Sequence, residues 1–233
     1  MRQGAVGYVE VVECRGRSVI EKHLTDSVRR NTEMLALHAL ADQPIPVPQL
    51  IQIRPDSLVM SLMPGERLDS LDAGAWLEGL RTSAGLLRQL HELRAPEGLP
   101  AAPDDAEIVR RYRNAGGPPL PLRIPPTDRL AFCHGDWTDA NLLGLNGKIT
   151  AVLDWEAAHL GDPIRDLSRA IWGASRKNPC VVDVLIHAYG ADPDRVYAWL
   201  PIHAAELWLW FAEAGPEQYY RQLTKDLTNW PRY

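Results

Sequence analysis

Cysteine and phenylalanine are scarce in this 233-residue sequence, which has three of the first and two of the second. The cysteines are Cys14, Cys133 and Cys180, and no Cys-x-x-Cys or cysteine/histidine spacing connects them. An odd count without such spacing excludes a disulfide framework and a zinc site as the basis of the fold. We therefore expect a reduced, cytoplasmic protein.

Long hydrophobic runs and an excess of basic charge are missing as well. No apolar stretch reaches membrane-spanning length, and the first seven residues lack the apolar segment of a signal peptide. Lysine and arginine number 25 against 30 acidic residues, so the net charge is −5. That balance gives no sign of a nucleic-acid-binding surface. We expect neither a membrane nor a nucleic-acid partner.

The first part of the chain has the pattern of strands around one helix. β-prone runs, turn residues and helix-capping residues alternate there, and Pro64-Gly65 ends the pattern. The dipeptide predicts a boundary between residues 1–64 and 65–233. The elements expected before it are a hairpin of strands 8–14 and 18–22, a helix of about 15 residues ending near Ala41, and strands 49–54 and 57–63.

The remainder is predicted to be mostly helical. An amphipathic pattern predicts a helix from about Ala73 to Leu93, and the tryptophan-rich stretch 163–233 is also helical in character. Residues 94–128 are rich in proline and glycine and are typical of a loop. The expected fold class is α+β, with a small N-terminal antiparallel sheet plus one helix and a larger, mostly helical C-terminal lobe that carries a hairpin.

The strongest local signal is Asn146-Gly147 between two apolar runs, which predicts a tight β-hairpin. A two-residue loop places Asn141 opposite Val152 and brings Asp154 to the same end of the hairpin. An amide oxygen and a carboxylate that converge suit a hard divalent cation such as Mg²⁺. Asn141 or Asp154 alone could be an ordinary turn residue. The hypothesis of a metal site therefore rests on the spacing between the two.

Three ordered motifs resemble a known family. Residues 134–141 read His-Gly-Asp-x-x-x-x-Asn, residues 153–156 read Leu-Asp-Trp-Glu, and Gly-Asp-Pro at 161–163 is followed by Asp166-Leu167. Together they resemble the aminoglycoside phosphotransferase-like family, relatives of the protein kinases, whose own loop reads HRDxxxxN. The resemblance implies a protein-kinase-like two-lobe fold and an ATP-dependent phosphotransferase with an alcohol group as acceptor.

The resemblance also implies roles for the motif residues. Asp136 would accept or orient the proton of the acceptor hydroxyl, while Asn141 and Asp154 would hold Mg²⁺ on the ATP phosphates. His134, Asp162 and Asp166 would support the site structurally. For Asp162 the residues alone suggest a helix cap, because Pro163 follows it at the first helical position.

On the nucleotide side, Lys22 is the only lysine before Lys148 and ends a predicted strand. It resembles the strand lysine of kinases, with Glu33 on the following helix as its partner; an exposed lysine and an ordinary helical glutamate are the alternative. Gly4 and Gly7 resemble a shortened phosphate-covering loop, and the usual first strand is expected to be missing. The other expected nucleotide contacts are the hinge residues Ser61, Leu62 and Met63, with Met60 at the back of the base pocket. The base is adenine by resemblance, although GTP is also compatible.

The acceptor is the least defined partner. Acidic groups beside aromatic faces would suit a cationic small molecule; by resemblance the default is an aminoglycoside or another antibiotic, with choline-like, amino-alcohol and sugar acceptors as alternatives. A core role for the tryptophans stays open, and the loop at 94–128 predicts an unusually open acceptor cleft or a small C-terminal lobe. The candidate acceptor residues are Trp137, Asp139, Trp155, Glu156, Glu206 and Trp210.

Two other readings remain. A pseudokinase-type nucleotide-binding module would keep the fold without the transfer reaction. An unrelated hydrolase would use His134 and Asp136 as metal ligands and would need further ligands, which the sequence does not offer nearby.

Overall fold

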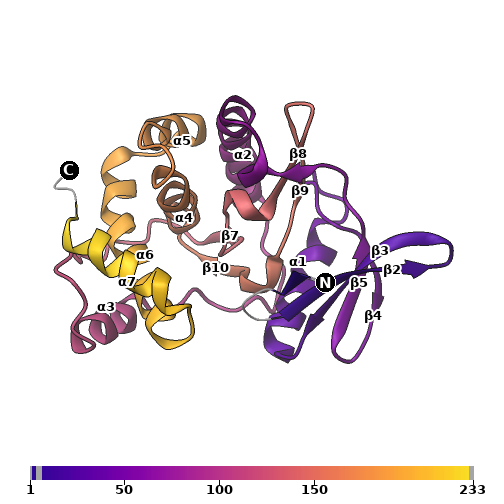
Figure 1. Ribbon diagram of the computed structural model, residues 1–233, viewed down its shortest axis with the longest axis horizontal. Coiled ribbons are helices and arrows are strands. Elements are labelled where there is room, and N and C mark those ends of the chain that lie inside the picture. Colours follow the sequence, from indigo (N-terminus) through magenta and orange to yellow (C-terminus); the bar gives the residue numbers. More distant parts are fainter. Residues whose placement is uncertain (1, 4–6, 231–233) are drawn as a thin grey trace.

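A computed structural model describes residues 2–3 and 7–230 of the chain. It has two parts, a small one built on a β-sheet and a larger one built mostly of helices (Figure 1). This is the α+β, two-lobe arrangement expected from the sequence. None of the described helices is long and apolar enough to cross a membrane.

The small part is an antiparallel sheet with one helix packed against it. Helix α1 (Ser27–Leu40) begins after Asp26, whose carboxylate accepts the amide N–H of Val28 at 2.8 Å. The expected hairpin, helix and strands are confirmed to within a few residues. The strand order is β1-β2-β3-β5-β4, with bounds β1 (Arg2–Gln3), β2 (Gly7–Cys14), β3 (Arg17–Leu24), β4 (Leu50–Ile53) and β5 (Ser57–Ser61).

The first strand corrects one expectation. The sequence pattern indicated that the usual first strand is missing, but Arg2 and Gln3 pair with Val9 and Tyr8 of β2. Two residues are too few to give a period-2 pattern, so only the pairing reveals the strand. Gly4, expected in the loop that joins these strands, lies outside the described residues.

The larger part is built around long helices. Two small sheets lie among them, one with order β6-β8-β9 and one formed by β7 and β10. Its elements are β6 (Glu66–Arg67), the short helix η1 (Leu68–Ser70), α2 (Ala73–Glu92), α3 (Asp105–Asn114), β7 (Ala131–Cys133), η2 (Asp139–Asn141), β8 (Leu142–Leu145), β9 (Lys148–Val152), η3 (Trp155–Ala157), β10 (His159–Gly161), α4 (Pro163–Ser175), α5 (Val181–Tyr189), α6 (Pro193–Glu213) and α7 (Glu217–Thr228).

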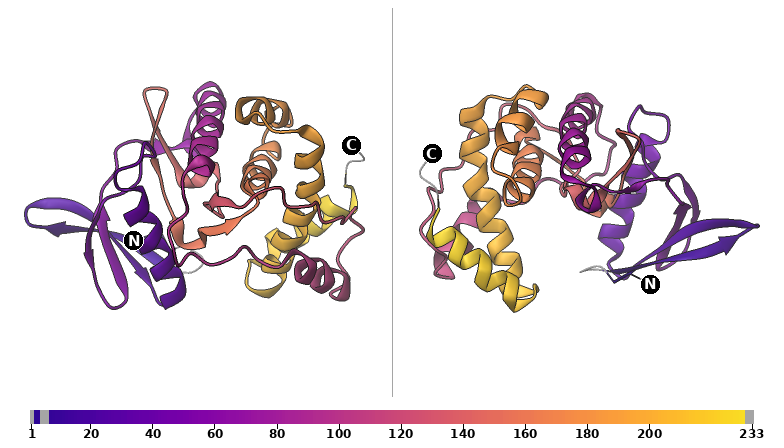
Figure 2. Two further views of the ribbon diagram at one scale, coloured as in Figure 1. Left: turned by 180° about the vertical axis from the view of Figure 1, so that it is seen from behind. Right: turned by 45° about the horizontal axis from the view of Figure 1, so that its top comes forward.

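The stretch 94–128 is only partly a loop, contrary to the expectation. Helix α3 forms within it, begins after the capping residue Asp104, and packs on α6 and α7. Its buried residues Ile108, Val109 and Tyr112 follow a helical spacing, which the surrounding prolines and glycines obscure in the sequence. Figure 2 shows α3, α6 and α7 at one end of the molecule and the five-stranded sheet at the other.

The β8–β9 hairpin forms as predicted at Asn146-Gly147, both with positive φ, but its register differs by one residue. A β-bulge at Thr150 places Leu142, not Asn141, opposite Val152. Asn141 instead lies opposite Leu153, whose amide N–H donates to the Asn141 carbonyl at 2.8 Å. The bulge frees the Thr150 hydroxyl to donate to the carbonyl of Pro64 at 2.5 Å, which no pattern in the sequence indicates.

The two parts meet around this hairpin. The amide N–H of Val152 donates to the carbonyl of Pro46 at 2.7 Å, in the connector that follows α1. Gly65 has φ of 114°, and a Cβ there would lie 2.9 Å from the carbonyl oxygen of Gly144, so glycine is required. Because β6 begins directly afterwards and pairs with β8, we propose that the domain boundary lies between residues 64 and 65.

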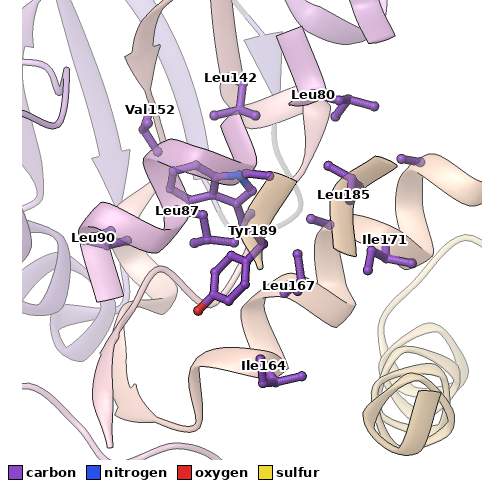
Figure 3. Packing of buried hydrophobic residues seen from close by; sticks show 14 of the residues in the cluster. Leu80, Leu87, Leu90, Leu142, Val152, Ile164, Leu167, Ile171, Leu185 and Tyr189 are labelled. Carbon is purple, nitrogen blue, oxygen red and sulfur yellow. The ribbon is translucent and has the colours of Figure 1, made fainter. Parts of the chain in front are cut away.

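The main core lies where α2, α4 and α5 meet (Figure 3). Leu87 of α2, Leu167 and Ile171 of α4, and Leu185 of α5 are buried in it. Because α4 also follows the Gly-Asp-Pro motif, this core fixes the helix that supports the candidate site.

Truncating this core should destabilise the protein. We expect Leu87→Ala to lower the free energy of unfolding by about 2–5 kcal/mol, since it removes buried methyl groups and leaves a cavity. The matched control is Leu145→Ala at the exposed hairpin tip, where the loss should stay within about 0.5 kcal/mol. Urea unfolding followed by circular dichroism measures both, and equal losses would contradict the assignment of the core.

Candidate active site

The loop that carries the His-Gly-Asp motif is held by one buried carboxylate. Asp166 of α4 accepts the amide N–H groups of His134 at 2.5 Å and Gly135 at 2.8 Å. Gly135 has φ of 85°, and a Cβ there would lie 2.1 Å from the carbonyl oxygen of Ala157, so only glycine fits. Asp166 therefore ties α4 to the loop, the structural role expected for it.

Asp166 is charged in the folded protein. Burial would raise its pKa, but the hydrogen bond and charge of His91, whose Nε2 lies 3.3 Å away, hold the pKa well below its usual range. A carboxylate that accepts two backbone N–H groups is stabilised in the same direction.

His134 braces the loop as well. Its Nε2–H donates to the carbonyl of Leu153 at 2.9 Å, and its Nδ1 accepts the amide N–H of Asp136 at 3.1 Å. Both ring nitrogens are thus used, and burial lowers its pKa. Asp162 caps α4 through the amide N–H of Ile164 at 2.9 Å and also pairs with Arg195 at 2.7 Å. Both residues take the structural positions expected for them.

Both carboxylate oxygens of Asp136, the candidate catalytic residue, contact neighbouring side chains. Arg169 of α4 contacts Oδ1 through Nε at 2.7 Å and Nη2 at 2.6 Å, and the Asn141 side-chain amide donates to Oδ2 at 2.9 Å. Burial would raise the pKa of Asp136, but the Arg169 guanidinium outweighs it and holds the pKa below its usual range. Asp136 is therefore an ionised and fixed carboxylate.

Arg169 is a site residue that the sequence reasoning missed. It lies one turn after Asp166 on α4, so the two residues share a helix face that points at the His-Gly-Asp loop. The i, i+3 spacing from the Gly-Asp-Pro-x-x-Asp motif is the signal that could have identified it. Its Nη1 also lies 3.1 Å from Nε2 of His203 on α6.

Asn141 and Asp154 sit at the same end of the β8–β9 hairpin, as expected. The Asn141 amide nitrogen bonds to the carbonyl and the carboxylate of Asp136, so its amide oxygen takes part in neither bond. Asp154 has φ of 68°, a left-handed conformation unusual for a residue other than glycine, and its side chain is 38% exposed. Backbone conformations of this kind cluster at functional sites.

Lys22 of β3 forms the expected ion pair with Glu33 of α1. Its Nζ lies 2.6 Å from Glu33, 2.6 Å from Asp154 and 3.1 Å from Glu156. Burial would lower the pKa of Lys22, but the three carboxylates outweigh it and raise the pKa, so the ammonium stays charged. Arg29, also on α1, contacts the other oxygen of Glu156 at 3.0 Å.

The remaining residues predicted to contact a nucleotide lie in different surroundings. Gly7 lines the site. A Cβ there would lie 2.2 Å from the carbonyl oxygen of His23 in the neighbouring strand, so the strand pairing requires a glycine at this position. Met60 is buried in the core. The amide N–H of Ser61 bonds the carbonyl of Gln49 at 2.9 Å, so of its backbone groups only the carbonyl stays a candidate for contact with a base. Leu62 and Met63 follow the end of β5 and stay candidates.

A cavity of about 410 Å³ joins these groups. Lys22, Asp136 and Asp154 line it, and Glu206 and Trp210 line it from α6. Of the acceptor candidates, Glu156 also lines this cavity and is ion-paired there with Lys22 and Arg29.

Three acceptor candidates do not line this cavity. Trp137 and Trp155 are fully buried and pack against His134, so they form the core beneath the loop. Asp139 accepts Trp76 Nε1 at 2.8 Å and Lys177 Nζ at 2.6 Å and does not line the cavity. Sequence cannot tell which side of a loop a side chain faces, and here the large aromatic rings take the inner side.

The fold and this site define a protein of the kinase-like phosphotransferase class. The model of the phosphotransferase enzyme family matches residues 20–199, more than half of the chain. The chain belongs to that family. A curated relative, mouse acyl-CoA dehydrogenase family member 10, is 41% identical over 51 residues, which make up 21% of this chain and 5% of the mouse protein.

Solved structures share the fold at low identity. A thermostable mutant of aminoglycoside phosphotransferase APH(4)-Ia superposes with a TM-score of 0.76 at 14% identity over 98% of this chain and 92% of that one. Macrolide 2'-phosphotransferase type I has a TM-score of 0.68 at 18% identity over 96% and 88%. APH(3'')-Id of Streptomyces rimosus, in complex with ADP and streptomycin, has a TM-score of 0.61 at 20% identity over 82% and 89%.

Removing the buried carboxylate that holds the loop should destabilise the protein in a pH-dependent way. We expect Asp166→Ala to lower the free energy of unfolding by about 3 kcal/mol at pH 7, since it leaves buried donors without their partner. The folded-state pKa lies well below the usual 3.8, so this contribution is complete above 3.8 and is lost progressively as the pH falls from that value towards the depressed folded-state pKa.

Urea unfolding at several pH values measures this effect. The difference between wild type and Asp166→Ala should be fully present at pH 5 and should shrink below about pH 4. The matched control is Asp72→Ala at the exposed start of α2, where the loss should be about 1 kcal/mol. A difference at pH 3 as large as at pH 7 would contradict the charged state assigned to Asp166.

Proposed function

We propose that this chain is a small-molecule kinase that transfers the γ-phosphoryl group of ATP to a hydroxyl group with the help of Mg²⁺. The observation that carries the proposal is the joint position of Lys22, Asp136 and Asp154 on one cavity, with Asn141 bonded to Asp136 beside it. Phosphoryl transfer depends mainly on positioning and charge neutralisation, so a cation, metal ligands and one orienting carboxylate are sufficient.

The residues fit a nucleotide-bound Mg²⁺. Asp154 offers an aimed, partly exposed carboxylate, and Asn141 offers an amide oxygen that its two hydrogen bonds leave unused. Hard oxygen donors of this kind suit Mg²⁺, which usually takes one or two protein ligands together with phosphate oxygens. The metal would supply charge neutralisation at the phosphates.

Lys22 would contact the α- and β-phosphates. Its ammonium is now shared among three carboxylates, so phosphate oxygens can replace Asp154 as a partner while Glu33 keeps the side chain in place. Leu62 and Met63 are the proposed contacts to the base, with ATP as the donor and GTP as the alternative.

Asp136 would orient the acceptor hydroxyl. Because Arg169 holds its pKa low, it is a weak base and is better suited to accept a hydrogen bond than to remove a proton early. A loose transition state needs little early proton removal, so this role is sufficient. Structural relatives have been solved in complex with streptomycin and with hygromycin B, and an antibiotic acceptor is one candidate for this chain beside amino alcohols and sugars.

Replacing the orienting carboxylate should separate transfer from binding. We expect Asp136→Asn to lower the rate of transfer from γ-labelled ATP about 10²–10⁴-fold, because a positioned acid–base group contributes about that much. Nucleotide affinity should stay within about twofold, since Asp136 does not face the α- and β-phosphates in this account. The acceptor panel is streptomycin, hygromycin B, choline and glucose, with slow ATP hydrolysis as a second readout.

The matched control is Asp128→Asn, a surface carboxylate in an ion pair with Arg195. It should leave both transfer and nucleotide binding unchanged. Equal loss of transfer and nucleotide affinity in Asp136→Asn would contradict the role given to Asp136, and nucleotide binding without transfer in the wild type would favour the pseudokinase reading.

A further inference from the structure

A histidine of α6 contacts the arginine that holds Asp136. His203 is buried and lines the same cavity as Asp136. Its Nε2 lies 3.1 Å from Nη1 of Arg169, and Arg169 contacts Oδ1 of Asp136 through Nε at 2.7 Å and Nη2 at 2.6 Å. Residues of α6, α4 and the His-Gly-Asp loop therefore form one chain of contacts that ends on the candidate catalytic carboxylate.

The chemistry of this contact fixes the protonation of His203. A guanidinium group carries only donors, so the histidine ring accepts the hydrogen bond through an Nε2 that has no proton. The ring is therefore neutral, with its one proton on Nδ1, which lies 3.7 Å from Oε2 of Glu206. A second proton would place another N–H donor and a positive charge against the guanidinium of Arg169.

The surroundings of His203 favour the neutral ring. Burial lowers its pKa below the usual 6.5, the charges of Arg169 and Arg165 add to this effect, and Glu206 opposes it. The charged groups around the ring come from several elements: Arg165 and Arg169 on α4, Glu206 on α6, Asp105 of α3 as the second partner of Arg165, Asp136 as the partner of Arg169, and Arg29 and Glu156 in the same cavity.

Arg169 needs a second anchor besides Asp136. It uses its Nε and Nη2 on the carboxylate, so Nη1 is the donor left for another partner. The side chain is only 22% exposed, and a donor shielded from water is costly when it has no acceptor. His203 supplies that acceptor from a buried position on α6, and it thereby restricts the rotamers of the long arginine side chain.

We propose that His203 is a positioning residue of the phosphoryl-transfer reaction. Its neutral ring anchors Arg169, and Arg169 fixes the direction in which the Asp136 carboxylate meets the acceptor hydroxyl. When the ring takes up a proton at low pH, the anchor is lost and transfer slows. This inference rests on the proposed kinase function and adds to it a residue outside the three motifs and a dependence on pH.

NMR of the histidine ring nitrogens in the full chain tests the contact without any activity. At pH 8 the ring of His203, assigned by its absence in His203→Gln, should carry its proton on Nδ1. Its pKa should rise in Arg169→Gln, because a positive charge beside the ring is removed. A proton on Nε2 at pH 8 would overturn the inference, since that nitrogen could not then accept from Arg169.

The rate of transfer from γ-labelled ATP against pH tests the role. Glutamine offers an amide oxygen as acceptor and takes up no proton, so His203→Gln should keep kcat within about threefold at pH 8. It should also lose the decline in kcat that the wild type shows as the pH falls below 6.5. His203→Leu, which has no acceptor, should lower kcat about 10–100-fold at pH 8 and change the KM for ATP by less than about twofold.

The matched control is His187→Gln on the exposed face of α5, which should keep the pH profile of the wild type. Because all variants use the same nucleotide, protonation of ATP affects their profiles equally. Identical profiles in wild type and His203→Gln would overturn the inference, and so would equal losses of kcat in His203→Gln and His203→Leu. If ATP neither binds nor reacts, the proposed function fails, and the position of the ring proton still decides whether His203 anchors Arg169.

Discussion

The buried ammonium of Lys22 is the interaction on which the rest of the site depends. It joins β3 and α1 of the small part to Asp154 and Glu156, which follow the hairpin of the larger part. A charge this deep in the protein is tolerated only because carboxylates surround it. The same ion pairs also fix the distance between the sheet and the hairpin. The positions of Lys22 and Asp154 are therefore determined by electrostatics as well as by packing.

Contacts between charged residues also hold the site together in the larger part. Asp166 holds the His-Gly-Asp loop, Arg169 holds Asp136, and Arg165 holds Glu206, and two of these three contacts begin from arginines on α4. Helix α4 therefore positions the loop, the candidate catalytic carboxylate and the face of α6 together. Because its inner face is packed in the core with Leu167 and Ile171, the charged residues of the helix have little freedom to move.

Much of this could be predicted from the sequence, because the relevant signals are local. The hairpin follows from Asn146-Gly147 and the cap of α4 from Asp162-Pro163. The Lys22–Glu33 ion pair was expected from the resemblance to the kinase strand lysine and its helical glutamate. Contacts set by tertiary structure could not be predicted.

The bulge at Thr150 occurs together with the hydroxyl contact to Pro64, which is distant in sequence, and the burial of Trp137 and Trp155 depends on which side of the loop faces the core. The pairing of Glu206 with Arg165 depends on α4 and α6 crossing side by side, so the sequence indicated an open carboxylate where the fold provides one that contacts a buried arginine.

Calorimetric titration with ATP and with GTP, each with and without Mg²⁺, on wild type and Asp154→Asn tests the central claim most directly. The account predicts that the wild type binds ATP at micromolar concentration and that removing Mg²⁺ weakens this binding about tenfold or more. Asp154→Asn should lose most of the Mg²⁺ dependence, because the metal loses its charged ligand. Nucleotide binding that does not respond to Mg²⁺ in the wild type, or an unchanged Mg²⁺ response in Asp154→Asn, would contradict the account.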